Sequence, residues 1–108
     1  MKGNNKKLNC CEKNSSSVKE LKRLKNFLKL FSDENRLRIV CTLRKEEKCV
    51  REIYKQLDLA QNLTSHHLKL LEKAKIVSWK KVGVKVFYKL NSKELERNTE
   101  LLSKFLKC

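Results

Sequence analysis

The stretch LDLAQNLTSHHLKLLEKA, Leu57–Ala74, decides how this chain folds. On a helical wheel with about 100° between successive residues, its side chains separate onto two faces. The apolar face carries Leu63, His67, Leu70, Leu71 and Ala74. The other face carries hydrogen-bonding and basic side chains, Asn62, Ser65, His66, Lys69 and Lys73. This pattern fits an ordinary amphipathic surface helix, and equally a helix that packs on a small core while entering the major groove of DNA.

The flanking segments favour the DNA-binding interpretation. Upstream, Val50–Leu57 is a second short amphipathic segment, followed by the turn Asp58-Leu59-Ala60. Two helices joined by a turn of three or four residues form a helix-turn-helix. Downstream, apolar and basic residues alternate along Ile76–Leu90 around Gly83, which predicts a basic two-stranded hairpin, or wing. We therefore predict a winged helix-turn-helix, a mainly α fold with a small β-hairpin.

Two further helices are expected before this unit, and one after it. Apolar residues at steps of three and four predict a first helix over Val18–Phe31. Ser32-Asp33-Glu34 has the pattern of a helix start, and we expect the second helix to run to about Arg44. A last helix is predicted over Lys93–Lys107, capped by Ser92. The second helix is expected to bury three residues: Leu37, Val40 and Cys41.

The composition indicates one small, strongly basic domain. The chain has 108 residues, with 27 Lys and Arg against 12 Asp and Glu, a net charge of +15. This charge favours a polyanionic partner, most simply nucleic acid, although a generally lysine-rich proteome would also raise it. The first residues lack the apolar run of a secretory signal, and no stretch approaches the roughly 20 apolar residues of a membrane span. We expect a cytoplasmic protein without a membrane partner, whose five cysteines remain thiols.

The residues also resemble a known family. Leu57–Val77 is similar to the helix-turn-helix signature of the ArsR/SmtB family of metal-responsive repressors. Leu28–Leu43 (LKLFSDENRLRIVCTL) resembles its opening helices, and Lys48–Ile53 (KCVREI) the start of its third helix. The resemblance covers about Val18 to Leu106 and implies a homodimer formed through the first and last helices. It departs at Cys49-Val50-Arg51, where many thiolate-sensing members have C-V-C.

The chain is accordingly divided into residues 1–17, a flexible tail that carries Cys10-Cys11 and a capping serine, and residues 18–108, a DNA-binding and dimerisation domain. A dimer would present two recognition helices to an imperfect palindrome in double-stranded DNA. Base-edge contacts are expected from Asn62, Ser65 and His66, and phosphate or capping contacts from Gln61 and Thr64. Further phosphate contacts are expected from Lys69, Lys73, Lys80, Lys81 and Lys85. His67 falls on the apolar face and is predicted to be a core histidine.

DNA binding itself requires no cofactor, but the cysteines suggest an inducer. Cys10, Cys11 and Cys49 would supply three soft thiolates for a thiophilic ion. By resemblance, such a set implies an arsenite or antimonite sensor that releases its operator on binding. Cadmium- and lead-responsive members commonly add a fourth cysteine, and Arg51 stands where it would be. Cadmium or lead is therefore the less favoured metal.

Other functions stay open. Cys41 and Cys108 resemble the dithiol of persulfide- or oxidant-sensing members of the family. The chain could also be a constitutive DNA-binding module, or a small metal-binding carrier that would not need a wing. A zinc site on the last helix is excluded because that segment contains no histidine. An enzyme is not expected, since the chain has no Gly-rich phosphate loop and its only histidines are the adjacent His66 and His67.

Overall fold

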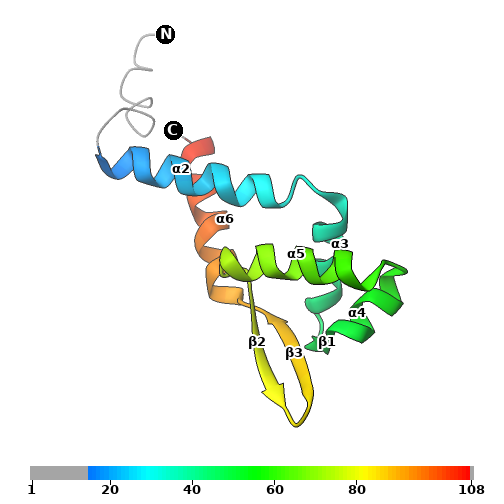
Figure 1. The fold of residues 1–108 in the computed structure, drawn as a ribbon. Coiled ribbons are helices and arrows are strands. Elements are labelled where there is room, and N and C mark those ends of the chain that lie inside the picture. Colours follow the sequence, from blue (N-terminus) through cyan, green and yellow to red (C-terminus); the bar gives the residue numbers. More distant parts are fainter. Residues whose placement is uncertain (1–14, 108) are drawn as a thin grey trace, which may run out of the picture.

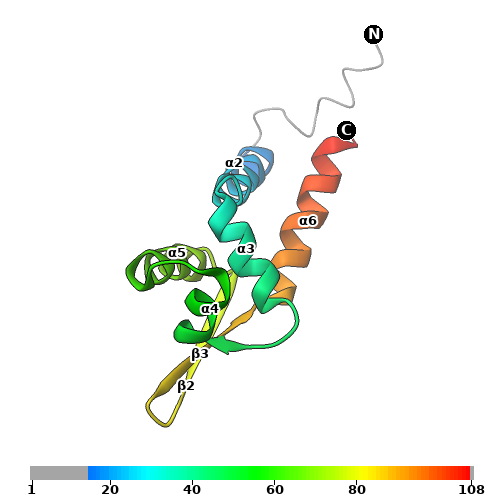
Figure 2. The ribbon, with the colours of Figure 1, turned by 90° about the vertical axis from the view of Figure 1, so that its right-hand side faces the viewer.

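A computed structural model describes residues 15–107 of the chain. These residues form five helices and a three-stranded antiparallel sheet, arranged as a winged helix-turn-helix (Figure 1). The elements follow one another as α2 (Ser15–Leu30), α3 (Glu34–Leu43), β1 (Lys48–Cys49), α4 (Val50–Leu57), α5 (Gln61–Lys73), β2 (Val77–Val82), β3 (Lys85–Leu90) and α6 (Ser92–Leu106). Helices α4 and α5 are the helix-turn-helix, and β2 and β3 project from the body as the wing (Figures 1 and 2).

Local chemistry explains most helix ends. The Asp33 side chain caps α3 by accepting hydrogen bonds from the backbone N–H groups of Asn35 (2.8 Å) and Arg36 (3.3 Å). Helix α4 ends at Asp58, whose left-handed backbone (φ 55°) begins the turn toward α5. The predicted cap of α6 was one residue off, because Asn91 and not Ser92 accepts from the backbone N–H of Glu94.

The first helix begins earlier than predicted. The serines assigned to the tail, Ser15–Ser17, form the first turn of α2. Three consecutive serines do not identify which of them is the cap, so the pattern could not locate the helix start. The remainder of the predicted tail, residues 1–14, lies outside the described residues together with Cys108.

The sheet has one strand more than the predicted hairpin. Its order is β1-β3-β2, with Lys48 opposite Tyr88 and Cys49 opposite Phe87. A strand of two residues has no periodicity to detect, and its partner lies far along the chain, so the sequence pattern missed it. The turn between β2 and β3 was located correctly, with Gly83 at φ 64° in a two-residue loop.

The core lies where α2, α3, α4 and α5 meet the base of the sheet. Its buried apolar residues are Leu24, Phe27, Ile39, Leu43, Ile53, Leu68, Leu71, Ile76 and Val77. The face predicted for α3 was mostly wrong: Val40 is half-buried and packs against the core, but Leu37 is 44% exposed and Cys41 is also exposed. The buried residues of α3 are instead Ile39 and Leu43. Apolar residues occur on several sides of α3, so its own pattern could not select the buried side.

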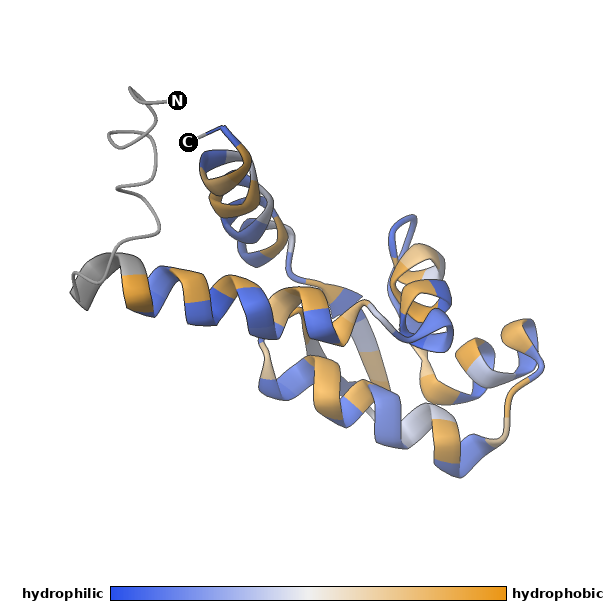
Figure 3. Cartoon of the chain, turned by 90° about the horizontal axis from the view of Figure 1, so that it is seen from above, coloured by the Kyte–Doolittle hydropathy of each residue, from blue (hydrophilic) through white to orange (hydrophobic). Residues whose placement is uncertain are grey.

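Helices α2 and α6 cross each other at the edge of this core (Figure 1). Two ion pairs link them, Arg23 to Glu94 (3.3 Å) and Lys104 to Glu20 (2.7 Å). Apolar and polar bands alternate along both helices (Figure 3), and several of their apolar side chains stay exposed. These exposed residues are Val18, Leu21, Leu28 and Leu106. None of the helices within residues 15–107 is both long enough and apolar enough to cross a lipid bilayer.

Candidate nucleic-acid interface

One side of α5 gathers half of the residues predicted to contact DNA. A shallow groove is lined by Gln61, Asn62, Ser65, His66 and Lys69. Ser65 is half-buried and the other four are exposed. Their amide, hydroxyl, imidazole and ammonium groups are the donors and acceptors that read base edges and hold phosphates. Lys73 lies apart from them, in a cavity between α2, α5 and α6.

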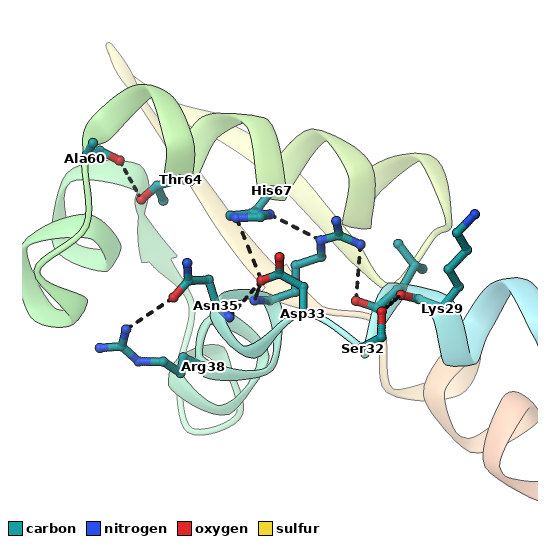
Figure 4. Close-up of polar contacts among 10 residues, drawn as sticks. Lys29, Ser32, Asp33, Asn35, Arg38, Ala60, Thr64 and His67 are labelled. Carbon is teal, nitrogen blue, oxygen red and sulfur yellow. Dashed lines mark hydrogen bonds and ion pairs between the residues drawn. The ribbon is translucent and has the colours of Figure 1, made fainter.

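The opposite side of α5 anchors the helix. Its buried residues are Thr64, His67, Leu68 and Leu71. The predicted phosphate role of Thr64 is wrong, because this side chain is fully buried and its hydroxyl donates to the carbonyl of Ala60 at 3.0 Å (Figure 4). Leu63, predicted to be buried, is 39% exposed. The buried face is therefore rotated by about one residue from the predicted one, since the core also receives Leu68.

His67 is also buried on this face, as predicted. Its Nδ1 accepts a hydrogen bond from Nε of Arg36 at 3.2 Å, and its Nε2 lies 4.0 Å from a carboxylate oxygen of Asp33 (Figure 4). Burial lowers the pKa of His67 below its ordinary value of 6.5, while the carboxylate of Asp33 acts in the opposite direction. His67 is therefore an uncharged imidazole at neutral pH.

The wing lies against α5 and carries exposed basic residues. Trp79 ties it to α5 by donating from Nε1 to a carboxylate oxygen of Glu72 at 2.6 Å. Lys81 and Lys85 are exposed beside the tip, where Val84 is 93% exposed. Lys80 instead forms an ion pair with Glu47 at 3.1 Å, so its charge is partly neutralised in the protein without DNA.

A second groove extends this surface onto α4. It is lined by Cys49, Val50, Arg51, Tyr54, Gln61, Lys85 and Val86. Gln61 belongs to both grooves, so they form one continuous surface between α4, α5 and β3. Sequence reasoning missed Arg51 and Tyr54 as surface residues of this interface. Their spacing of three on the helix before the recognition helix was the available signal.

Comparisons with known proteins agree with this architecture. The family model described as "Bacterial regulatory protein, arsR family" matches residues 33–78, from the cap of α3 into β2. The transcriptional activator HlyU of Vibrio cholerae is 36% identical over 102 residues, which cover 94% of this chain and 89% of HlyU. This chain belongs to the ArsR family.

A solved structure and a second sequence relative are also similar to this ArsR-family protein. The structure of reduced HlyU from Vibrio cholerae superposes with a TM-score of 0.70 at 34% identity, over 88% of this chain and 99% of that one. The arsenical resistance operon repressor of Staphylococcus aureus is 36% identical over 70 residues, 65% of this chain and 67% of the repressor. These ArsR-family relatives are transcriptional regulators and not enzymes, in agreement with the prediction.

Two of the five cysteines of this ArsR-family protein, Cys41 and Cys49, lie within the described residues. Cys49 is half-exposed at the cap of α4, where its backbone N–H donates to a carboxylate oxygen of Glu52 at 2.9 Å. Cys41 is exposed on α3. Three predicted sensing residues, Cys10, Cys11 and Cys108, lie outside residues 15–107. Within those residues no group of three or more His, Cys, Asp or Glu side chains could hold a metal ion.

Proposed function

We propose that this transcriptional regulator is a dimeric repressor that binds an imperfect palindromic operator through α5 and the wing. The observation that carries the proposal is the continuous groove from Asn62, Ser65 and His66 to the basic side chains of Arg51 and Lys85. Base edges would meet the amide, hydroxyl and imidazole groups, and the phosphate backbone would meet the basic ones. The net charge of +15 favours the same partner.

The proposed dimer forms through α2 and α6. The exposed side chains of Val18, Leu21 and Leu28 on α2, together with Leu106 on α6, are an apolar surface that a second copy would cover. Two-fold symmetry would then set the two α5 helices about one turn of DNA apart, roughly 34–36 Å, as half-sites of a palindrome require.

The DNA proposal is tested with an operator that the wild-type protein selects from random duplexes. We expect Ser65→Ala and His66→Ala each to reduce discrimination against random DNA by about 1–3 kcal/mol. Lys85→Ala should weaken binding to all sequences alike and reduce its salt dependence. Lys93→Ala removes the same charge from α6, away from the grooves, and is the matched control. Unchanged discrimination in both α5 variants would contradict the recognition-helix assignment.

For the inducer we propose arsenite or antimonite, bound by thiolates of Cys10, Cys11 and Cys49. Cys49 is half-exposed and lies in the groove with Arg51 and Lys85. This position supports the proposal, because its thiol would be accessible to a ligand and close to bound DNA. A ligand there would compete with operator binding, and a coupling of about 1–3 kcal/mol would change affinity roughly 5- to 150-fold. Cadmium and lead are the weaker candidates, since Arg51 supplies no fourth thiolate.

A second candidate is a persulfide- or oxidant-responsive regulator that uses Cys41 and Cys108. The observation that favours it is the exposure of Cys41, which leaves its thiol accessible to oxidants. Operator release is measured against arsenite, antimonite, cadmium, zinc and polysulfide. Release by arsenite that requires Cys10, Cys11 and Cys49 supports the first proposal. Release by polysulfide that requires Cys41 and Cys108 replaces it. A protein that responds to none of these is a constitutive DNA-binding module.

A further inference from the structure

The side chain of Arg36 joins three elements of the fold. Arg36 lies on α3, and its Nη1 donates to the carbonyl of Leu30, the last residue of α2, at 3.3 Å. Its Nε donates to Nδ1 of His67 on α5 at 3.2 Å. Figure 4 shows His67 above the α3 cap, with the dashed line from its ring to this guanidinium. One guanidinium thus connects the end of a proposed dimer helix to the buried face of the recognition helix.

The chemistry of this contact fixes the protonation state of His67. An arginine guanidinium has donors only, so Nδ1 of His67 must be the acceptor and carries no proton. The ring proton is then on Nε2, which faces the carboxylate of Asp33 at 4.0 Å. A second proton on the ring would put a donor at Nδ1 opposite the Nε–H of Arg36, and this hydrogen bond would be lost.

The charged and titratable groups around His67 act in different directions. Asp33, at the cap of α3, would attract a protonated ring, whereas Arg36 of α3 and His66 of α5 would oppose it. Protonation therefore draws the ring toward Asp33 and away from Arg36. The ring is buried on α5 and closely packed, so it cannot move alone. Its displacement must therefore be accompanied by a shift of α5 or of the α2–α3 junction.

We propose that Arg36 is a positioning residue for operator recognition: through neutral His67 it sets the rotation of α5 relative to the α2–α3 junction, and protonation of His67 releases that setting. The inference rests on the proposed operator-binding function. His67 directly follows His66 and lies two residues after Ser65, so a small rotation of α5 displaces both predicted base contacts. Hydrogen bonds to base edges tolerate only a few tenths of an ångström, so operator affinity falls as the pH falls.

The test measures affinity for the selected operator from about pH 7.5 down to about pH 4.5, a range that extends well below the ordinary histidine pKa because burial lowers the pKa of His67. It uses a His66→Gln background, so that His67 is the only histidine left in the chain. In this background we expect affinity to fall by about fivefold or more at the lower pH, the small end of typical coupling. A flat profile overturns the proposal.

Three variants separate positioning from general structural damage. His67→Asn keeps a side-chain acceptor for Arg36 without a titrating group, so it should bind at neutral pH within about threefold of its parent and lose the acid sensitivity. Arg36→Gln should bind more weakly at neutral pH and also lose most of the acid sensitivity. The matched control is Arg38→Gln, which removes the other α3 guanidinium, one that donates to the carbonyl of Leu57 at 2.9 Å. Arg38→Gln should keep the acid sensitivity, and its loss there would overturn the assignment to Arg36.

A measurement on the unmutated protein covers the case in which a variant fails to fold. The ¹⁵N shifts of the His67 ring report its tautomer directly, and we expect the form protonated at Nε2 at neutral pH. The form protonated at Nδ1 would overturn the proposal. Failure of the proposed function is distinguishable, because the wild-type protein would then select no DNA at neutral pH. An intact selection with no effect of pH or of Arg36→Gln contradicts the positioning role alone.

Discussion

The helix-turn-helix and the α2–α6 pair are held together in different ways. Helices α3, α4 and α5 meet through side chains that are fully buried, among them Ile39, Ile53, Leu68 and Leu71. Helices α2 and α6 are linked by two ion pairs, in which Glu94 is mostly buried while Arg23, Glu20 and Lys104 are accessible, and apolar residues of both helices still face outward. Leu24 and Phe27 of α2 also belong to this core, but Val18, Leu21 and Leu28 on the same helix stay uncovered within one chain. In the proposed dimer a second copy would cover them, so a single protomer would lack part of the stability of the dimer.

The largest effect is expected inside the helix-turn-helix. Leu68→Ala should lower the free energy of unfolding by about 2–5 kcal/mol, because it leaves a cavity in a close-packed site. Leu63→Ala makes the same change on the same helix at a site that is 39% exposed, and should stay within about 0.5 kcal/mol of wild type. Urea unfolding at one fixed protein concentration measures both. A larger loss for Leu63→Ala than for Leu68→Ala would mean that the buried face of α5 is the predicted one and not the observed one.

The next effect concerns the apolar surface of α2. Leu28 is 45% exposed, so a dimer would bury about half of its side chain in each protomer. The two copies together would contribute about 1.5–3 kcal/mol, and Leu28→Ala should raise the dimer dissociation constant roughly 10- to 150-fold. Leu37→Ala, at 44% exposure on α3, is the matched control and should leave it unchanged. Sedimentation equilibrium measures the dimer dissociation constant of both variants. Equal constants for Leu28→Ala and Leu37→Ala would mean that α2 is not part of the dimer interface.

A smaller effect is expected at the start of α6. Asn91→Ala removes the side chain that caps the helix and should reduce the free energy of unfolding by about 1 kcal/mol. Ser92→Ala changes the neighbouring residue, which is exposed and already helical, and should cost no more than a few tenths of that. Thermal unfolding of the two variants side by side is sufficient. A larger loss of unfolding free energy for Ser92→Ala than for Asn91→Ala would mean that Ser92 is the cap, as predicted from the sequence.

The smallest effect is expected at the ion pair between α2 and α6. Glu20→Gln removes the carboxylate that Lys104 approaches at 2.7 Å, and should destabilise the protein by about 0.2–1 kcal/mol. Raising the salt concentration toward about 1 M should abolish the difference from wild type, because exposed charges are then screened. Glu100→Gln makes the same change at an exposed site on α6 and is the control. A salt-independent loss would mean that Glu20 acts through packing.

The sequence was sufficient to predict those features of the structure that depend on neighbouring residues. The bounds of α4 and the turn at Gly83 were predicted, because each depends on residues within a few positions of one another. The start of α3 was located to within one residue, since Ser32 was predicted as the cap and Asp33 is the observed one. The groove residues Gln61, Asn62, Ser65, His66 and Lys69 were predicted together for the same reason, since one helix repeat brings them to one side.

The sequence was insufficient wherever a distant residue decides the outcome. Thr64 and Leu63 exchanged their predicted environments because the packing of α3 and α4, and not the α5 pattern, determines which side is buried. The contact of Arg36 with His67 joins residues 31 positions apart, and no local periodicity marks it. Strand β1 likewise exists only because β3 pairs with it. The roles of Cys10, Cys11 and Cys108 stay predictions.

The connection of α2 to α6 also has a consequence for the order in which the chain folds. The ion pair of Glu20 and Lys104 joins residues 84 positions apart, whereas α3, α4 and α5 pack against one another within Glu34–Lys73. A ribosome adds about 5–20 residues per second, so α6 emerges a few seconds after α5. During that interval the nascent chain can form its helix-turn-helix while the apolar side of α2 has neither α6 nor a second subunit beside it. The leucines that would join two subunits in the proposed dimer are then exposed on the nascent chain, where chaperones can bind them and where they can promote aggregation.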